Sequence, residues 1–275
     1  MDLTHITPLI IVFNEEPNLR RTLQRLAWAR DIVIIDSGST DATLDIVREF
    51  PQVRVLERPF DTFARQCNFG LEQVRTEWVL SLDADYVLTD AWISEVTALQ
   101  PGPEVMGLTA QFVYCVYGRP LRASLYPPRT VLYRRASGTY RDDGHGHRVS
   151  ISGECRRLHA KILHDDRKPL SRWFVAQLKY ADAEAQKLIA AMPQELNKAD
   201  RIRRWVWCAP LLVPGYTLLG KRLILDGRAG LFYAFQRMLA ELMLSLRLLE
   251  LRITRMKSPP PNAQNSSRRT GHAGG

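Results

Sequence analysis

Two aspartates separated by one residue, Asp83 and Asp85, directly follow a short apolar stretch at residues 78–82. Carboxylate oxygens are the ligands that Mg²⁺ and Mn²⁺ prefer, so this pair could hold a divalent cation directly or through water. Such a cation would act as a Lewis acid on a departing diphosphate. The alternative is a solvated acidic turn that caps a helix beginning near Thr89.

Polar residues also follow two earlier apolar stretches. Asn14 and Glu15 come after residues 8–13, and Asp36 comes after residues 32–35. A carboxylate at the end of a strand often binds the hydroxyl or N–H groups of a nucleotide, so Asp36 is a candidate contact to a base or ribose. Capping of the following helix is the alternative for Asp36. Asn14 and Glu15 would border the same nucleotide.

Arg65 and Asn68 lie three residues apart in a stretch, residues 63–74, whose apolar residues recur at helical spacing. About one helical turn therefore separates the two residues on the helix that precedes the aspartate pair. Arg65 could meet a phosphate oxygen. An ordinary surface arginine is the alternative.

Strands and helices alternate along the first hundred residues. Apolar stretches predict strands at residues 8–13, 32–35, 53–56 and 78–82. Helical periodicity fills the segments between them, and this order predicts an α/β fold with a mostly parallel sheet flanked by helices. Ligands bind at the carboxyl ends of the strands in such sheets, so we expect Asn14, Asp36 and Asp83 to converge on one crevice.

The pattern beyond residue 104 is mixed. It predicts strands at residues 105–113 and 131–133, and helices at about 170–192 and 229–253. The segment 205–220 is apolar, but two prolines interrupt it. It is too short and too broken for a transmembrane helix to be assigned.

The net charge of +9 is concentrated near the C-terminus, where residues 197–257 hold 12 Lys and Arg against 4 Asp and Glu. Basic residues combined with Leu, Trp and Phe favour an anionic membrane surface as partner over nucleic acid, for which no motif is present. Trp205, Trp207 and Tyr216 beside basic residues are typical of a membrane interface. A second layer of helices packed over the sheet is the alternative.

The four cysteines lie far apart and form no CxxC pair: Cys67, Cys115, Cys155 and Cys208. This spacing argues against a zinc site or a disulfide framework and fits a reducing cytosol. We also expect no signal peptide, because the first residues lack a basic segment followed by an apolar one.

Three motifs, taken in order, resemble the family 2 glycosyltransferases: residues 8–16, 35–41 and 78–85. Together they cover the first part of the chain. Residues 65–68 and 226–231 are further similar to the branch that contains the lipopolysaccharide core glucosyltransferases of bacteria.

The resemblance implies a GT-A fold, an inverting mechanism, a nucleotide-diphosphate sugar donor and a divalent metal, Mg²⁺ or Mn²⁺. It implies that Asp36 contacts the nucleotide and that Asp83 and Asp85 contact the metal and diphosphate. We therefore expect the nucleotide-sugar to be bound by Asn14, Glu15, Asp36, Arg65, Asn68 and Asp83.

On this resemblance we expect a GT-A catalytic domain over residues 1–165, with a nucleotide-sugar-binding half at 1–115 and an acceptor-side half at 116–165. A helical, amphipathic and basic extension that associates with the membrane would cover residues 166–257. The tail at 258–275 is low in hydrophobicity and is expected to be disordered.

The chain departs from the pattern of this branch at two positions. Tyr86 follows the aspartate pair where relatives often carry Glu, and Arg148 follows His147 where relatives tend to carry Glu. An inverting transfer needs a carboxylate that takes the proton of the acceptor hydroxyl, and Asp142 and Asp143 are the candidates. Either could instead be a turn residue. His147 could donate to phosphate or acceptor, or have a structural role.

We therefore expect an inverting glycosyltransferase that moves a sugar, from a UDP-sugar, to a lipid-linked or lipopolysaccharide/envelope polysaccharide acceptor. It would be cytoplasmic and attached peripherally to the cytoplasmic face of the inner membrane. One alternative is a catalytically impaired, membrane-recruited module that binds nucleotide-sugars. The other is a sugar-phosphate nucleotidyltransferase, which would carry a Gly-rich loop where this chain has Asn-Glu-Glu-Pro at residues 14–17.

Overall fold

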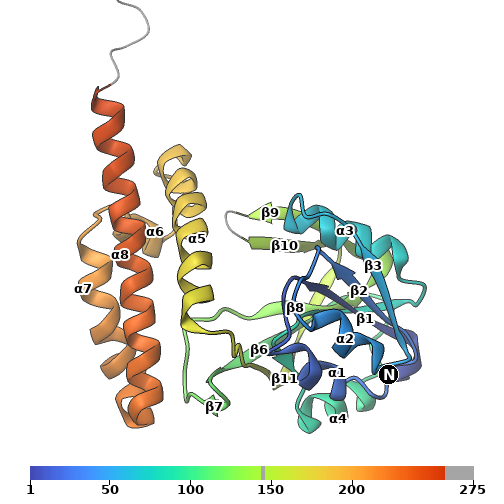
Figure 1. The fold of residues 1–275 in the computed structure, drawn as a ribbon. Coiled ribbons are helices and arrows are strands. Elements are labelled where there is room, and N and C mark those ends of the chain that lie inside the picture. Colours follow the sequence, from blue (N-terminus) through green and yellow to red (C-terminus); the bar gives the residue numbers. More distant parts are fainter. Residues whose placement is uncertain (144–145, 258–275) are drawn as a thin grey trace, which may run out of the picture.

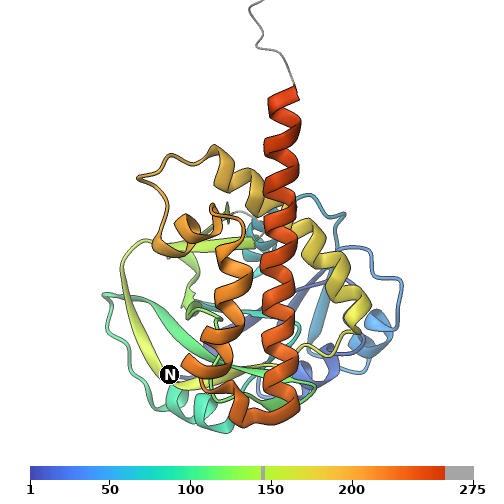
Figure 2. The same cartoon turned by 90° about the vertical axis from the view of Figure 1, so that its left-hand side faces the viewer.

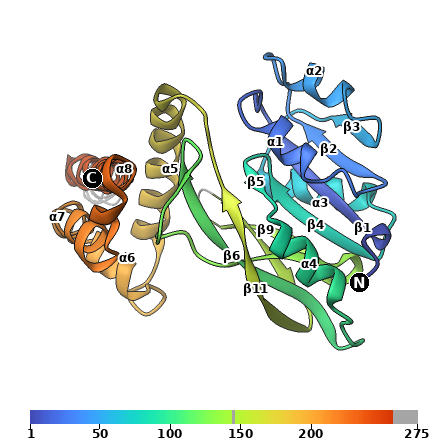
Figure 3. The ribbon, with the colours of Figure 1, turned by 90° about the horizontal axis from the view of Figure 1, so that it is seen from below.

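The computed structural model describes residues 1–143 and 146–257, without the side chains of residues 142–148 and 255–257. An α/β domain and a group of long helices make up the described chain, and α5 lies between the sheet and α8 (Figure 1). The same arrangement is seen from below (Figure 3). The tail at 258–275, for which disorder is expected, lies outside the described residues.

The first half of the sheet is parallel. Its strands, in the spatial order β3-β2-β1-β4, are β1 (Ile6–Val12), β2 (Ile32–Asp36), β3 (Val53–Glu57) and β4 (Trp78–Asp83). The connecting helices are α1 (Leu19–Gln24), α2 (Thr43–Arg48) and α3 (Phe63–Gln73), and α4 (Asp90–Ala98) follows β4. Every residue of β2 is buried, as a continuous apolar stretch in a central parallel strand predicts.

The second half of the sheet adds antiparallel pairings. β4 pairs with β8 (Arg129–Arg134), and β8 pairs with β6 (Val105–Val116). β11 (Glu154–His164) then runs parallel to β6, and the short β5 (Tyr86–Val87) closes the order antiparallel to β11. β7 (Arg119–Pro120) pairs with β6, and β9 (Gly138–Asp143) forms a separate hairpin with β10 (Gly146–Ile151).

Alternate residues of the strands feed two apolar cores, one on each face of the sheet. Ile10 and Ile34 pack with α1, α2 and α4 on one face. Leu9 and Val33, their neighbours along the strands, pack with α3 and β9 on the other. Successive side chains of a strand point to opposite faces, so β1 and β2 need apolar residues at nearly every position.

Four helices follow the sheet: α5 (Leu170–Ala190), α6 (Lys198–Arg203), α7 (Cys208–Gly215) and α8 (Gly227–Lys257). α7 continues into a π-helical turn at Tyr216–Gly220, and α8 runs past α5 and α7 on the face turned to the viewer in Figure 2. An apolar cluster that includes Ala185, Leu188 and Leu248 joins α5 to α8. None of the described helices combines the length and the apolar character needed to cross a bilayer.

The start of α8 depends on two glycines of the 226–231 motif. Gly227 adopts a φ of +58°, which favours glycine, where the chain turns into α8. A Cβ atom on Gly230 would lie 1.8 Å from the carbonyl oxygen of Leu223, so only glycine lets the two backbones approach this closely. Asp226 accepts hydrogen bonds from the backbone N–H and the Nε of Arg122, at 3.1 and 2.7 Å. The motif therefore fastens α8 to the loop between β7 and β8.

Candidate active site

The ends of three parallel strands bring the predicted polar residues to one edge of the sheet. Asp36 ends β2 and is the register partner of Val12, the last residue of β1. Asp83 ends β4 and is the partner of Ile11 in β1. Asn14 lies two residues beyond the end of β1. The three side chains predicted to converge therefore stand on adjacent strand ends.

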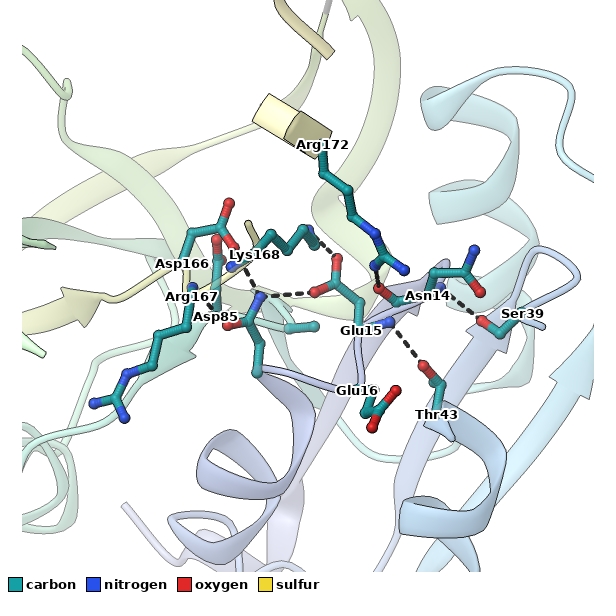
Figure 4. Close-up of polar contacts among 12 residues, drawn as sticks. Asn14, Glu15, Glu16, Ser39, Thr43, Asp85, Asp166, Arg167, Lys168 and Arg172 are labelled. Atoms are coloured by element: carbon teal, nitrogen blue, oxygen red, sulfur yellow. Dashed lines mark hydrogen bonds and ion pairs between the residues drawn. The ribbon is translucent and has the colours of Figure 1, made fainter. Parts of the chain in front are cut away.

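The loop after β1 is bonded to the loop after β2. The backbone N–H of Asn14 donates to Ser39 Oγ at 2.9 Å (Figure 4), and Asn14 Oδ1 accepts from the Thr40 N–H at 2.7 Å. Asn14 itself has a φ of +56°, a conformation that asparagine tolerates better than most residues. Asn14 thus shapes the rim of the crevice, and its amide oxygen is engaged by the loop.

Asp36 is buried and uses only one of its carboxylate oxygens. Oδ2 accepts the N–H groups of Gly38 and Ser39 at 2.9 and 3.0 Å, which closes the turn after β2 and caps no helix, because α2 begins only at Thr43. Oδ1 is buried and has no hydrogen-bond partner among the described residues. Buried acceptors are normally satisfied, so Oδ1 is free to accept a hydrogen bond from a ligand in the crevice.

Glu15 is held by the segment that leads into α5. Its carboxylate accepts from Asn18 Nδ2 at 2.9 Å and lies 2.6 Å from Lys168 Nζ, and its N–H donates to Thr43 Oγ1 at 2.7 Å (Figure 4). Burial raises the pKa of Glu15 to about 7, against the opposing effect of the Lys168 charge. Glu15 is therefore placed at the crevice, but its carboxylate is occupied by Asn18 and Lys168.

The aspartate pair has a partner that the sequence did not reveal. Asp85 is buried, and its Oδ2 lies 3.2 Å from Nε2 of His164, the last residue of β11. Asp85 Oδ1 and His164 Nδ1 are both buried without a partner in the described part of the chain. Burial lowers the pKa of His164, but Asp85 outweighs it and the net shift is upward.

These groups fit a divalent cation that a bound substrate helps to hold. Asp85 has a carboxylate oxygen without a partner, and Asp83 stands two residues earlier in the chain; carboxylate oxygens are the hard donors that Mg²⁺ or Mn²⁺ prefers. Within residues 1–143 and 146–257, no group of three or more His, Cys, Asp or Glu is arranged to hold a metal ion. Substrate phosphates and water commonly complete the coordination of Mg²⁺.

Tyr86, which stands where relatives often carry Glu, belongs to an aromatic cluster behind the aspartate pair. Its hydroxyl is hydrogen-bonded to the hydroxyl of Tyr126, and its ring centroid lies 5.3 Å from that of His164. The ring of Phe112 also packs on Tyr86, with 4.7 Å between the two ring centroids. Tyr86 is buried, and burial raises its pKa well above the ordinary value. It therefore supplies packing around His164 and no carboxylate.

Arg129 is a second residue that the sequence analysis missed. It is the first residue of β8, half-buried, with its guanidinium carbon 5.2 Å from the ring centroid of Tyr126. Burial acts to lower the pKa of Arg129, but Tyr86 and Tyr126, followed by Asp83 and Asp85, raise it overall. A guanidinium near the aspartate pair is suited to an anionic ligand.

The structure does not bring Arg65 into this group. Its side chain is 73% exposed and pairs with Asp61 at 3.6 Å, as the surface interpretation predicted. Asn68, by contrast, bonds the backbone of Tyr140 in β9 with both ends of its amide, at 3.1 and 2.9 Å. Asn68 therefore positions the β9–β10 hairpin against α3.

That hairpin carries the candidate bases. Asp142 and Asp143 lie in β9 and His147 lies in β10, where His147 pairs with Asp142 in the register. Their side chains lie outside the described residues, so their roles remain predictions.

The segment after β11 lies against the loops after β1 and β2 on the side of the helices. Arg172, in the first turn of α5, donates from Nη1 to the carbonyl oxygen of Asn14 at 2.5 Å. The contact with Asn14 is drawn in Figure 4, and Nη2 of Arg172 lies 3.7 Å from Asp41. Together with the pair between Lys168 and Glu15, this contact fixes α5 beside the loops after β1 and β2.

The family model described as glycosyl transferase family 2 matches residues 8–153, more than half of the chain. The chain belongs to this family. Residues 8–153 contain the strand-end crevice, the aspartate pair and the β9–β10 hairpin. The protein is thus a family 2 glycosyltransferase with a GT-A-like α/β domain, which sets the nucleotidyltransferase alternative aside.

Two relatives of this protein are similar in sequence. One is the lipopolysaccharide core biosynthesis glycosyltransferase LpsC of Rhizobium meliloti, which is 26% identical to it over 253 residues. That match covers 84% of this chain and 89% of LpsC. The SPbeta prophage-derived glycosyltransferase SunS of Bacillus subtilis is 34% identical over 87 residues, 30% of this chain and 21% of SunS.

Two solved structures are also similar. The mannosyltransferase PcManGT of Pyrobaculum calidifontis, in complex with GDP-Man and Mn²⁺, is 16% identical with a TM-score of 0.49, covering 92% of this chain and 88% of PcManGT. Staphylococcus aureus TarS 1–349, in complex with UDP-GlcNAc, is 15% identical with a TM-score of 0.46, covering 91% of this chain and 92% of TarS.

Proposed function

We propose that this family 2 glycosyltransferase moves a sugar, with inversion, from a UDP-sugar to a lipid-linked or lipopolysaccharide/envelope polysaccharide acceptor. The observation that carries the donor half is the pair of unpartnered buried carboxylate oxygens, Asp36 Oδ1 and Asp85 Oδ1. Asp36 ends β2 and Asp85 lies two residues beyond the end of β4, on either side of β1, and α/β sheets bind nucleotides at such carboxyl ends of strands.

On the donor side, Asp36 Oδ1 accepts a hydrogen bond from the base or ribose. Asp83 and Asp85 would hold Mg²⁺ or Mn²⁺, which when bound supplies the positive charge that the leaving diphosphate needs. His164 fixes the orientation of Asp85 through their 3.2 Å contact. Partners of this kind orient a metal ligand and tune its affinity.

On the acceptor side, a carboxylate must take the proton of the attacking hydroxyl on the face opposite the leaving group. Asp142 and Asp143 are proposed for this role, and His147 is proposed to contact phosphate or acceptor. The hairpin that carries them is anchored through Tyr140 to Asn68 of α3, the helix that packs on the parallel sheet. This anchoring supports the proposal, because a base must be held at a defined distance from the donor.

The similarity to LpsC over most of both chains supports an acceptor in lipopolysaccharide or another envelope polysaccharide. We also propose that the protein is cytoplasmic and attaches to the inner membrane through an apolar surface around α7. That surface consists of Trp205, Trp207, Leu211, Leu212, Tyr216 and Leu219, each more than half exposed. Lys221 and Arg222 follow it directly, and aromatic residues beside basic ones suit an anionic interface.

The donor half is tested with Asp85→Asn, which keeps the size of the side chain and removes its charge. We expect metal-dependent binding of the donor, and its hydrolysis, to be lost. Asp90→Asn is the matched control, because Asp90 is exposed and pairs with Arg25 away from the crevice. A thermal-shift panel of UDP-, GDP- and dTDP-sugars with and without Mn²⁺ identifies the nucleotide. Unchanged metal-dependent binding in Asp85→Asn would falsify the assignment.

Membrane attachment is tested separately by sedimentation with anionic liposomes at low salt. We expect the protein to sediment with vesicles that contain phosphatidylglycerol. Replacement of Trp205 and Trp207 by Ser should weaken this binding while donor hydrolysis is retained. If the wild-type protein stays in the supernatant, the peripheral attachment is wrong, and the donor chemistry is unaffected by that result.

A further inference from the structure

An open pocket of about 690 Å³ lies far from the donor crevice, between the α5–α6 connection, the end of α6 and α8. Its lining residues are Pro193, Gln194, Leu196, Arg201, Arg204, Trp205 and Arg252. A second cavity of about 250 Å³ shares Arg204 and Arg252 with it and reaches the apolar residues Leu188, Ile189 and Leu248. The two spaces together have a basic mouth and an apolar wall.

The pocket gathers three guanidinium groups and no carboxylate. Arg201 donates from Nε to the Leu196 carbonyl at 3.1 Å, and Arg252 donates from Nη2 to the Arg204 carbonyl at 2.6 Å. The guanidinium of Arg204 has no hydrogen bond or ion pair with the described residues. Each arginine therefore has N–H donors left over, and their like charges repel one another in the absence of an anion.

Arg203, the residue before Arg204, differs from the pocket arginines because carboxylates pair with it. Its guanidinium faces Glu241 at 2.7 Å and Asp200 at 3.4 Å, so its charge is compensated inside the helical layer. Carboxylates thus neutralise the arginine on one side of residues 203–204, but none pairs with the arginine on the other side among the described residues. The uncompensated side is the one that opens to solvent beside Trp205, which is 67% exposed.

The pocket is also separate from the reaction. Arg172 marks the crevice end of α5, and Ile189, which lines the smaller cavity, lies near the other end. At 1.5 Å per residue, about 25 Å of helix separates them. An anion bound in the pocket would therefore lie well away from the proposed site of the donor and its metal.

We propose that this pocket binds the phosphate of an anionic phospholipid headgroup, with Arg201, Arg204 and Arg252 as the phosphate ligands and Trp205 against the adjoining part of the lipid. Guanidinium groups match phosphate oxygens through paired N–H donors. Tryptophan prefers the depth of the headgroups at a membrane surface. The inference rests on the proposed membrane attachment and adds a specific site to it.

The test compares Arg204→Gln/Arg252→Gln with Lys179→Gln/Lys198→Gln. Both double variants lose two positive charges, but Lys179 and Lys198 are exposed and neither lines the pocket. Binding is measured to phosphatidylcholine vesicles with and without phosphatidylglycerol. We expect the arginine variant to lose about tenfold or more in affinity for the anionic vesicles, and the lysine variant to lose clearly less.

Equal losses in the two variants would mean that diffuse charge, and no pocket, attracts the membrane, and would overturn the proposal. So would saturation of the pocket by soluble glycerol phosphate that leaves vesicle binding of the wild type unchanged, since the pocket would then hold free phosphate and not the lipid. Arg204→Gln alone, which removes no hydrogen bond of the described residues, serves if the double variant is unstable. Donor hydrolysis, measured on the same samples, should be unchanged, so failure of the donor chemistry remains distinguishable.

Discussion

The Nζ atom of Lys168 lies 2.6 Å from Oε1 of Glu15, and this ion pair joins the end of β1 to the segment that leads into α5. Arg172 adds a hydrogen bond to the Asn14 carbonyl one helical turn further on. Two cations from the start of the helical layer are therefore fastened to the loop after β1, which borders the proposed donor site. Changes at this contact should affect both the stability of the protein and the shape of the crevice.

Glu15 should make stability depend on pH in a defined direction. Burial raises its pKa from 4.5 to about 7, so the folded protein binds more protons than the unfolded chain between these values. Its contribution is therefore fully present below about pH 4.5 and is lost as the pH rises through 7. The loss is at most about 3 kcal/mol.

Denaturant unfolding of the wild type and of Glu15→Gln from pH 4.5 to 8 measures this effect. The variant should show a flatter decline of the unfolding free energy across that range. Glu16→Gln, at the exposed neighbour, is the control and should follow the wild type. Parallel curves for the wild type and Glu15→Gln would contradict the prediction.

His164→Gln should lower the affinity for Mn²⁺ in the presence of donor by about 10- to 100-fold, because Asp85 loses the partner that orients it. Titration of Mn²⁺ against donor hydrolysis measures the change. His159→Gln, on the exposed side of the same strand, should leave the Mn²⁺ dependence as it is. A purely structural role for His164 would lower the melting temperature and leave the Mn²⁺ dependence of the folded fraction unaltered.

Arg129→Gln should weaken binding of the donor diphosphate by about 10- to 100-fold, the usual effect of losing a charge-assisted hydrogen bond. We expect the rise in the donor KM to exceed the fall in kcat, and we expect Arg129→Lys to restore part of the affinity. Arg135→Gln, at an exposed arginine shortly after the same strand, is the control. Wild-type affinity for the nucleoside diphosphate in Arg129→Gln would exclude this role.

Gly230→Ala should destabilise the protein by about 1–3 kcal/mol, because the added Cβ meets the Leu223 carbonyl oxygen and forces the backbones apart. Gly215→Ala, in the helical segment α7 with no atom within 4 Å of the added Cβ, should be neutral or stabilising by about 0.5–1 kcal/mol. Thermal unfolding of the two variants compares them directly. If both glycines tolerate alanine equally, the close approach at the start of α8 is not what requires glycine.

The sequence was sufficient for the donor half because its signals are local. A strand buried on both faces requires apolar residues at nearly every position, so β1, β2 and β4 stand out as uninterrupted stretches. The polar residues that follow such strands must lie at one edge of a parallel sheet. Asn14, Asp36 and Asp83 were placed together by that reasoning alone.

The second half of the sheet was less predictable. β6 extends to Val116 and pairs with both β8 and β11, which the apolar pattern at 105–113 did not indicate. Asn68 was expected to bind the nucleotide-sugar, but its amide bonds the backbone of Tyr140, 72 residues away. A residue's type and helical position do not reveal which distant backbone will lie beside it.

By itself, then, the sequence determined the parallel strands of the first half of the sheet, the gathering of polar residues at their carboxyl ends and the basic, apolar character of the C-terminal segment. Tertiary structure alone decided that His164 stands beside Asp85, that Lys168 closes on Glu15 and that Arg201, Arg204 and Arg252 line one pocket. The physical reason is the same for all three. Each grouping depends on how β11 pairs in the sheet or how α6 and α8 pack, and those contacts join residues that the chain keeps far apart.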